Sequence, residues 1–194
     1  MQINKLTPRQ RQTTFETIEP IFYKIFNESY WTFPEWTLER IPRNVNTKRL
    51  SLDECKMSKG WLYESYNTKG IFRCVKCIKN GMKECDTTWS SSYPTVLFRA
   101  YYEDMWLGGR VQMKIYAQQC KKCGEYMTAE FEKERLNSLA KWLYRWIASH
   151  FYNIYFNDHG YQGRRRLAKH RDDLCEACDA GWCYYLKVKN SKRG

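Results

Sequence analysis

The sequence lacks several features, and each absence narrows the classes of protein to which the chain can belong. No stretch reaches the roughly 18 apolar residues that a membrane span needs. The apolar patch at 142–147 is short and contains Arg145. Residues 1–11 are polar and have no apolar stretch of the kind found in a secretory signal. We therefore expect a soluble, cytoplasmic protein.

Catalytic motifs are missing as well. The sequence contains no glycine-rich phosphate loop, no HExxH and no GxSxG. It has only 3 histidines, whereas a catalytic zinc usually has histidine-rich ligands and an open coordination position. We therefore expect a binding protein and not an enzyme.

Apolar and aromatic residues, in contrast, are plentiful. Of the 194 residues, 43% are hydrophobic and 16% aromatic, which is enough to bury a core and argues against a disordered chain. The formal net charge is +12, and nearly all of the excess lies in residues 55–194. Such a field favours anionic partners, namely nucleic acid, an anionic membrane face or an acidic protein segment. The alternative is a solvated basic surface with no dedicated ligand.

The 9 cysteines determine the class of protein. Six of them form three CxxC pairs, which are Cys74 with Cys77, Cys120 with Cys123, and Cys175 with Cys178. Two intervening residues let a tight turn aim both thiolates at one point, as a tetrahedral zinc site requires. Disulfides, a redox-active pair and an iron–sulfur cluster are the alternatives. An odd number of cysteines argues against disulfides. Three pairs with basic spacers argue against a redox-active pair.

Three pairs supply too many thiolates for one zinc ion and too few for two. The third pair has His170 five residues before it and Cys183 five residues after it, which would complete a Cys₃His set. We therefore predict two structural Zn²⁺ sites, although an interleaved pairing remains open. The predicted ligands are Cys74, Cys77, Cys120 and Cys123 for the first site, and His170, Cys175, Cys178 and Cys183 for the second. Cys55 and Cys85 are interpreted as ordinary or semi-buried thiols, with a role as a ligand as the alternative for either.

Hydrophobic periodicity predicts two helices. The first spans about 8–28, where Thr7 can cap the helix, Pro8 fits the first turn and Pro20 weakens the interior. The second spans about 131–153. Its apolar stripe consists of Leu136, Leu139, Leu143, Trp146, Ile147 and His150. We expect this stripe to pack on a sheet, although a groove for a partner is the alternative.

The middle of the chain has strand composition. Strands are expected at 70–74, 92–102 and 110–119, with a hairpin turn at Gly108-Gly109 before the third. Residues 29–60 are expected to be irregular. The resulting fold class is α+β, a zinc-stabilised antiparallel β-sheet with flanking helices. Residues 1–60 would pack on a zinc-binding domain that spans 61–194 and contains a basic loop at 157–171.

Several segments resemble the 3CxxC-type zinc finger family. They are the runs at 72–77, 89–92, 109–123 and 174–183, within a likeness that covers roughly 60–183. The stretch Gly-x-Val-x-Met-x-Ile-x-x-Gln-x-Cys-x-x-Cys is the most specific of them. Within that family the sequence looks most like the receptor-transporting proteins, and the zygote arrest proteins are more distant.

The resemblance implies a zinc-binding adaptor or chaperone that promotes the cell-surface trafficking of G-protein-coupled receptors. Its expected location is the cytosolic face of the endoplasmic reticulum, the Golgi or the plasma membrane. The family usually carries a C-terminal transmembrane anchor, and no such segment is seen up to Gly194. The chain is therefore expected to be a truncated form or a soluble member, which weakens the trafficking interpretation.

The alternative is an RNA-binding zinc-finger protein with an antiviral or translational-control role. Basic residues interleave with aromatic ones such as Tyr116 and Tyr126, which could stack on unpaired bases. The candidate nucleic-acid contacts are Lys121, Lys122, Arg164, Arg165, Arg166 and Trp182.

Overall fold

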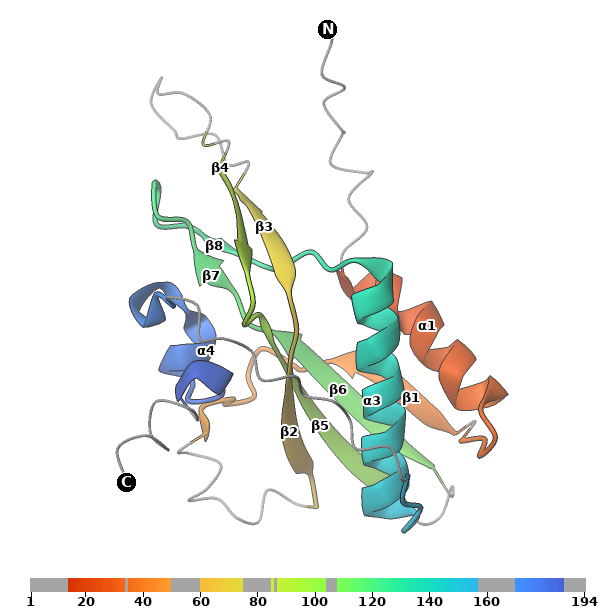
Figure 1. Cartoon of the computed structure of the whole chain (residues 1–194). Coiled ribbons are helices and arrows are strands. Elements are labelled where there is room, and N and C mark those ends of the chain that lie inside the picture. Colours follow the sequence, from red (N-terminus) through yellow and green to blue (C-terminus); the bar gives the residue numbers. More distant parts are fainter. Residues whose placement is uncertain are drawn as a thin grey trace, which may run out of the picture.

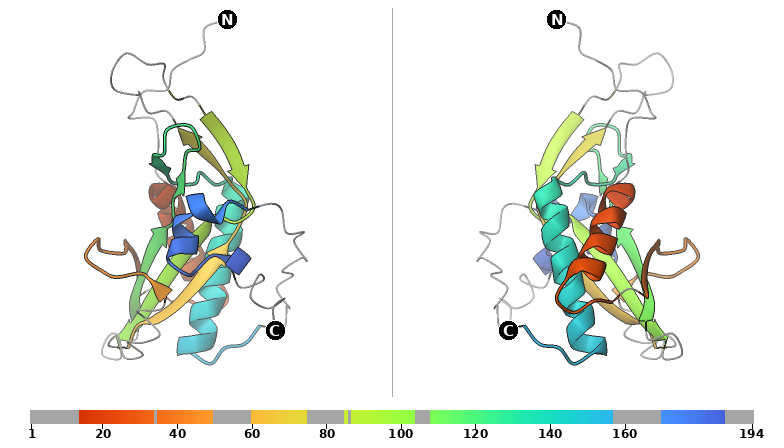
Figure 2. Two further views of the ribbon diagram at one scale, coloured as in Figure 1. Left: turned by 90° about the vertical axis from the view of Figure 1, so that its left-hand side faces the viewer. Right: turned by 90° about the vertical axis from the view of Figure 1, so that its right-hand side faces the viewer.

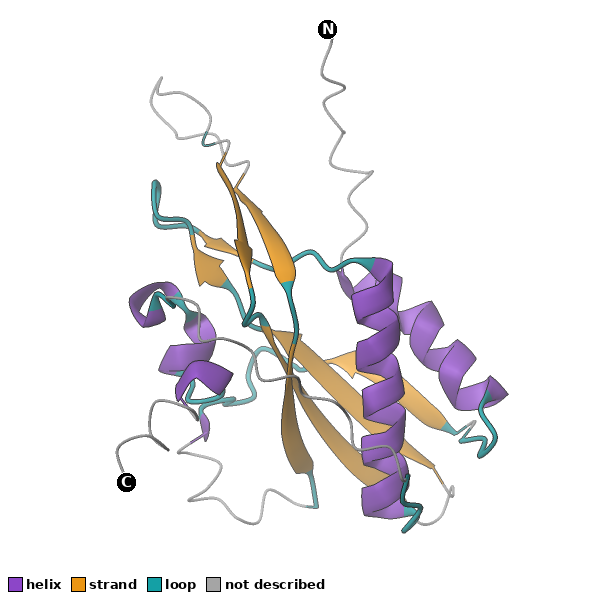
Figure 3. Ribbon diagram, in the orientation of Figure 1, coloured by secondary structure: helices purple, strands orange, loops and turns teal. Residues whose placement is uncertain are grey.

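The computed structural model describes residues 14–33, 35–49, 60–74, 85, 87–103, 108–156 and 170–186. A four-stranded sheet lies at the centre, with two long helices against one face (Figure 1). A small cysteine-rich lobe packs on the opposite face, and two short hairpins extend from one end of the sheet (Figure 3). This arrangement confirms the α+β class with a mainly antiparallel sheet.

The central sheet has the strand order β1-β6-β5-β2. Its strands are β1 (Trp36–Arg40), β2 (Leu62–Asn67), β5 (Thr95–Glu103) and β6 (Gly108–Ile115). The pairs β2–β5 and β5–β6 are antiparallel, whereas β1 pairs with β6 in parallel. The expectation that 29–60 is irregular is therefore wrong at β1, where Trp36 and Leu38 alternate inward as in a half-buried strand.

The two glycines expected to make a hairpin turn instead lie inside β6. A Cβ on Gly108 would stand 2.3 Å from the Cβ of Glu35, and one on Gly109 would stand 2.3 Å from the carbonyl oxygen of Tyr101. The Trp36 ring also crosses directly over Gly109. The glycines are therefore needed for close approach of neighbouring backbone and of an indole, and not for a turn.

The helices cover the sheet as their periodicity predicted. They are α1 (Thr14–Glu28) and α3 (Lys133–Phe151). The expected cap and first turn of the first helix, Thr7 and Pro8, lie outside the described residues. Five of the six stripe residues of α3 are buried in the core that it forms with α1 and the sheet. The sixth, His150, is exposed at the last turn.

The strand expected at 110–119 is interrupted. β6 ends at Ile115, and the next residues form β7 (Gln118–Gln119), which pairs with β8 (Tyr126–Met127) in a second hairpin. A further hairpin pairs β3 (Gly70–Cys74) with β4 (Thr87–Ser91). The C-terminal lobe contains the 3-10 turn η3 (Asp172–Leu174) and the short helix α4 (Glu176–Asp179).

The two remaining views show how the layers stack: α1 and α3 run side by side, while the α4 lobe lies across the sheet from them (Figure 2). Within the described part of the chain, no helix is both long enough and apolar enough to cross a bilayer.

Candidate metal centres

Four cysteine sulfurs meet between the two hairpins and form the first centre. The ligand atoms of Cys74, Cys85, Cys120 and Cys123 all lie within 4.8 Å of one another. The sulfurs of Cys74 and Cys123 are 3.4 Å apart, and those of Cys85 and Cys120 are 3.5 Å apart. Tetrahedral zinc with Zn–S bonds of about 2.3 Å holds its sulfurs about 3.8 Å apart. The cluster therefore has the size of a Cys₄ zinc site.

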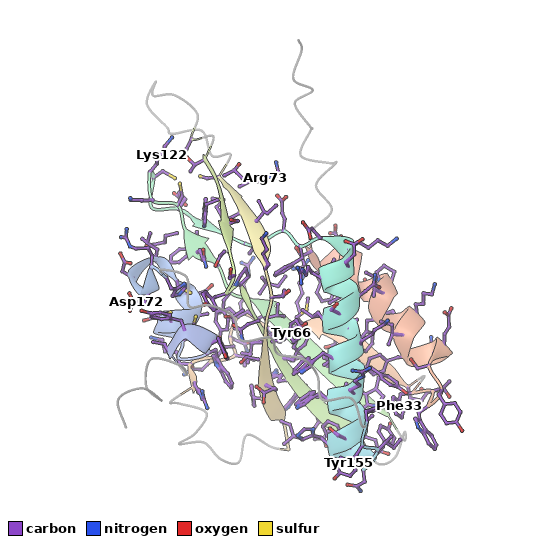
Figure 4. All side chains as sticks on the ribbon, viewed as in Figure 1. Phe33, Tyr66, Arg73, Lys122, Tyr155 and Asp172 are labelled. Atoms are coloured by element: carbon purple, nitrogen blue, oxygen red, sulfur yellow. The ribbon has the colours of Figure 1, made fainter. Side chains whose placement is uncertain are left out.

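The tight turn between β7 and β8 aims two of these thiols. The Cys120 carbonyl accepts a hydrogen bond from the Gly124 N–H at 2.8 Å, and the Cys120 N–H donates to the Glu125 carbonyl, also at 2.8 Å. Gly124 has a φ of 72°, in the left-handed region that glycine adopts without strain. This turn leaves Lys121 and Lys122 exposed at its outer edge, where Figure 4 shows Lys122 at one end of the molecule.

Two stacked aromatic rings support the first centre. Phe72 on β3 and Trp89 on β4 lie parallel, with ring centroids 5.2 Å apart. The Trp89 indole N–H donates a 3.0 Å hydrogen bond to the Gln118 side chain, which in turn donates to Ser91. The β3–β4 hairpin is thereby fixed to the β7–β8 hairpin, so both present their cysteines to one point.

The second centre is formed by a histidine and three cysteines in the C-terminal lobe. The ligand atoms of His170, Cys175, Cys178 and Cys183 lie within 4.8 Å of one another. His170 Nε2 lies 3.2 Å from the Cys178 sulfur and 3.6 Å from the Cys183 sulfur. The imidazole thus presents Nε2 to the cluster, as expected for a Cys₃His zinc site.

Main-chain and side-chain bonds join this lobe to the central sheet. Cys175 forms a β-bridge with Gln118, and the Glu176 N–H donates to the Ala117 carbonyl at 3.1 Å. One Glu176 carboxylate oxygen accepts the Ala117 N–H at 2.7 Å, while the other lies 2.8 Å from the Lys114 ammonium. The second centre is therefore anchored where β6 gives way to β7.

The segment after β1 secures the lobe from the other side. The Thr47 carbonyl accepts hydrogen bonds from the Trp182 indole at 2.8 Å and from the Tyr116 hydroxyl at 2.9 Å. The Arg49 N–H donates to the Ala180 carbonyl at 2.8 Å. Both rings are buried, Trp182 at 6% and Tyr116 at 1% exposure. Burial accordingly raises the pKa of Tyr116 well above its ordinary value.

The proton affinities of the clustered groups reflect their crowding. Burial opposes ionisation of Cys120, but hydrogen bonds from the backbone N–H groups of Cys123 and Lys122 lower its pKa to about 6. In the second cluster, hydrogen bonds from Cys178 and then Cys183 hold the pKa of Cys175 far below its ordinary value, while the pKa of Cys178 is raised. Thiols this close share protons, and a divalent cation would replace those protons.

Both clusters fit Zn²⁺ as the resident ion. Thiolate and imidazole are the ligands of structural zinc sites, and each cluster supplies all four from protein side chains. These two clusters support the prediction of two zinc ions. The first centre would crosslink distant parts of the chain, since it joins the end of β3 to the turn after β7, whereas the second would hold the C-terminal lobe together.

The first cluster contains one cysteine that the sequence interpretation did not count among the ligands. The second cluster contains all four predicted residues. The first contains Cys74, Cys120 and Cys123 of the predicted set together with Cys85. Cys77 and Cys55 lie outside the described residues, so the place of Cys77 in this site stays a prediction. The interpretation of Cys85 as an ordinary thiol is therefore corrected. The sequence signal that could have found it was its position two residues before β4, whose first residue, Thr87, pairs with Cys74.

The candidate nucleic-acid contacts differ in their exposure, and some lie outside the described residues. Lys121 and Lys122 are exposed, whereas Arg164, Arg165 and Arg166 lie outside the described residues. The Trp182 ring is unavailable to stack on a base, because it is buried beneath the second centre with its N–H bonded to Thr47. The same correction applies to Tyr116, while Tyr126 keeps 55% of its surface exposed.

The fold and the two centres together define a small protein organised by structural zinc. The sequence model of the 3CxxC-type zinc-binding domain matches residues 67–181, more than half of the chain. The chain therefore belongs to the 3CxxC-type zinc-binding family. The matched segment includes seven of the eight clustered ligands and ends two residues before Cys183.

Receptor-transporting proteins are among the relatives of this chain. Receptor-transporting protein 4 of Homo sapiens is 26% identical over 168 residues, which cover 78% of this chain and 62% of that protein. Receptor-transporting protein 1 of Homo sapiens is 28% identical over 134 residues, covering 64% and 46% respectively. The Mus musculus receptor-transporting protein 4 is 23% identical over 171 residues, covering 84% and 62%. The chain thus spans less than two thirds of these relatives, and no solved structure matches it.

Proposed function

We propose that this chain is a zinc-stabilised adaptor that promotes the cell-surface trafficking of G-protein-coupled receptors. The observation that carries the proposal is the likeness to receptor-transporting proteins 4 and 1, taken with the family match over 67–181. That match spans both hairpins, strands β5 and β6 of the central sheet and helix α4. The likeness therefore covers the parts of the fold that zinc would hold in place.

The metal centres support a binding role over a catalytic one. Each cluster surrounds its metal position with four protein ligands, which leaves no coordination site for a substrate or an activated water. Their chemistry also suits a reducing compartment, because cysteine thiols that bind zinc must stay unoxidised. We place the protein in the cytoplasm, on the cytosolic face of the membranes through which receptors travel.

Surface delivery of a receptor tests this function directly. An epitope-tagged odorant receptor would be expressed with and without the chain, and its surface level measured by flow cytometry on unpermeabilised cells. We expect a several-fold increase with the native chain and none with Cys178→Ser, which removes a ligand of the second centre. The control Lys141→Gln changes an exposed α3 residue and should behave as native. No increase with the native chain for any of several receptors would refute the function.

RNA binding is the second candidate, favoured by one surface. Exposed Lys121 and Lys122 lie on the turn of the first centre, close in sequence to half-exposed Tyr126. Such an arrangement can hold phosphates while a ring stacks on a base. Binding to single-stranded RNA should weaken steeply as salt rises. It should also weaken in Lys121→Gln/Lys122→Gln, and salt-insensitive or absent binding would remove this candidate.

A further inference from the structure

The first zinc centre would carry more negative charge than the second. Four thiolates around one Zn²⁺ leave a net charge of 2−, whereas three thiolates and a neutral histidine leave 1−. Negative charge in a buried site needs hydrogen-bond donors that reach the sulfur atoms. The donors around the first centre therefore contribute to how firmly it holds its metal.

The backbone supplies donors to one of these sulfurs. The Cys120 sulfur accepts hydrogen bonds from the N–H groups of Cys123 and Lys122, which belong to the turn after β7. These donors come with the fold of the CxxC turn, and no change of a side chain removes them directly. Cys120 is thus held by the local backbone.

Cys85 has a side-chain donor instead. The Thr87 hydroxyl oxygen lies 3.4 Å from the Cys85 sulfur, within the range of an O–H···S hydrogen bond. A zinc-bound cysteine has lost its proton, so the hydroxyl is the donor in this bond. Cys85 is only 4% exposed, which leaves water little access to its sulfur. The hydroxyl therefore takes the place that water has at an exposed thiolate.

Strand register explains the position of this threonine. Thr87 is the first residue of β4 and pairs with Cys74, the last residue of β3. Because side chains alternate across a strand, Thr87 shares a face with Trp89, whose ring packs beside the cysteines. Thr88 faces the other way and is exposed. Thr87 thus lies between a cross-strand ligand and a ligand two residues earlier in the chain.

Cys85 has particular need of such a partner. It is the only member of the first cluster that does not belong to a CxxC pair, so no CxxC turn positions its sulfur. The shape of threonine suits a strand, but valine has the same branched shape and the same preference. What threonine adds at this position is the hydroxyl.

We propose that Thr87 is a positioning residue of the first zinc centre. Its hydroxyl donates to the Cys85 thiolate, holds that sulfur at the metal and lowers its reactivity toward electrophiles, because a donated hydrogen bond withdraws electron density from sulfur. Polar partners of metal ligands typically contribute about 10- to 100-fold in metal affinity. Thr87 would thereby supply for Cys85 what the CxxC turn supplies for Cys120.

Zinc competition on the full chain tests this role. Thr87→Val keeps the branched side chain and removes the hydroxyl, so we expect about tenfold weaker zinc binding at one of the two centres, measured against a chromogenic chelator. Thr87→Ser keeps the hydroxyl and should bind zinc about as tightly as the native chain. The matched control Thr88→Val makes the same change on the exposed face of β4 and should behave as native.

Two further readouts separate a hydrogen bond to sulfur from a merely structural role. With Co²⁺ in place of zinc, the thiolate-to-cobalt charge-transfer absorption should move to lower energy in Thr87→Val, because the sulfur has lost its donor. Iodoacetamide followed by mass spectrometry should alkylate Cys85 several-fold faster in zinc-loaded Thr87→Val than in the native chain. In the native chain we expect Cys123 to react first, since it is the one ligand of this centre that is not buried.

The opposite results would overturn the proposal. Equal zinc affinity and equal Cys85 alkylation in Thr87→Val and Thr88→Val would show that the hydroxyl has no part in the centre. Equal weakening by Thr87→Val and Thr87→Ser would assign the effect to packing of the strand. Fast alkylation of Cys85 in the zinc-loaded native chain would contradict the proposal even if Thr87→Val did not fold. None of these results depends on the partner that the chain binds.

Discussion

The two zinc centres differ in what surrounds them. The first lies at the end of two short hairpins, with a small apolar shell of Trp89 and Met127 beside its cysteines. The second is part of a larger core that includes Leu97 of β5, Tyr93 just before β5 and Tyr116 just after β6. It also receives direct bonds from the sheet and from the segment after β1.

This difference indicates that the two centres stabilise different parts of the fold. Because the second centre covers a face of the sheet, losing its metal should expose apolar side chains such as Leu97 and Tyr116 and lower global stability. Because the first centre lies at a projecting end, losing its metal should loosen the hairpins while the sheet and helices remain packed. The following changes test the contrast, in order of expected effect.

The largest effect is expected from Cys183→Ser. Cys183 is fully buried and faces His170 in the second centre. We expect one zinc ion to be lost and the free energy of unfolding to fall by about 4 kcal/mol or more, since structural zinc contributes roughly 10–16 kcal/mol in isolated fingers. Denaturant titration at fixed zinc concentration measures the loss. An unchanged midpoint would mean that this lobe does not support the sheet.

Cys85→Ser should have a smaller effect on stability with the same loss of one zinc ion. Only the hairpins depend on the first centre, so we expect the free energy of unfolding to fall by about 1–3 kcal/mol. The matched variant is Cys77→Ser. Retention of both zinc ions by Cys77→Ser would establish Cys74, Cys85, Cys120 and Cys123 as the ligand set. Loss of zinc from Cys77→Ser and not from Cys85→Ser would show that Cys77 is the fourth ligand of the first centre.

Two tryptophan substitutions compare the supports of the centres. Trp182→Phe keeps an aromatic ring but removes the bond to the Thr47 carbonyl, and Trp89→Phe removes the bond to Gln118. Each substitution should lower the free energy of unfolding by about 1 kcal/mol. Zinc transfer to a chelator should accelerate at the second centre for Trp182→Phe and at the first for Trp89→Phe. Acceleration at the opposite centre in either variant would contradict the assignment.

The smallest expected effect is that of Gly124→Ala in the turn of the first centre. A Cβ there would meet nothing within 4 Å, so the cost comes only from the left-handed φ of 72°. We expect that strain to destabilise the folded turn of Gly124→Ala by about 1 kcal/mol. Gly124→Asn should be destabilised less, because asparagine tolerates this conformation. Competition with a chelator would detect the weaker zinc affinity. Equal affinities for all three chains would show that the turn is not constrained.

Local patterns in the sequence were sufficient to predict much of this organisation. The CxxC spacings indicated zinc because ligand geometry is set within four residues. The apolar stripe of α3 placed that helix on the sheet, and only His150, which is exposed in the last turn, departs from it. Cys85 escaped prediction because it reaches the first centre through strand pairing across a hairpin, which spacing does not encode.

The other differences share a long-range origin. The Gly108-Gly109 pair has the composition of a turn, but the close approach of Glu35 and Trp36 from β1 is what requires glycine there. Trp182 and Tyr116 were interpreted as exposed aromatic residues that interleave with the basic residues of 55–194. Both instead bond to one carbonyl, that of Thr47, more than 60 positions away in sequence. Contacts between distant segments decided these positions.

The most direct test of the whole account is the zinc content of the unsubstituted chain, purified under reducing conditions and measured by elemental analysis. The two clusters predict two zinc ions per chain, neither of them exchanging with added magnesium or calcium. One zinc ion per chain would mean that only one cluster is a metal centre. A chain that folds with none would contradict the claim that zinc holds this structure together.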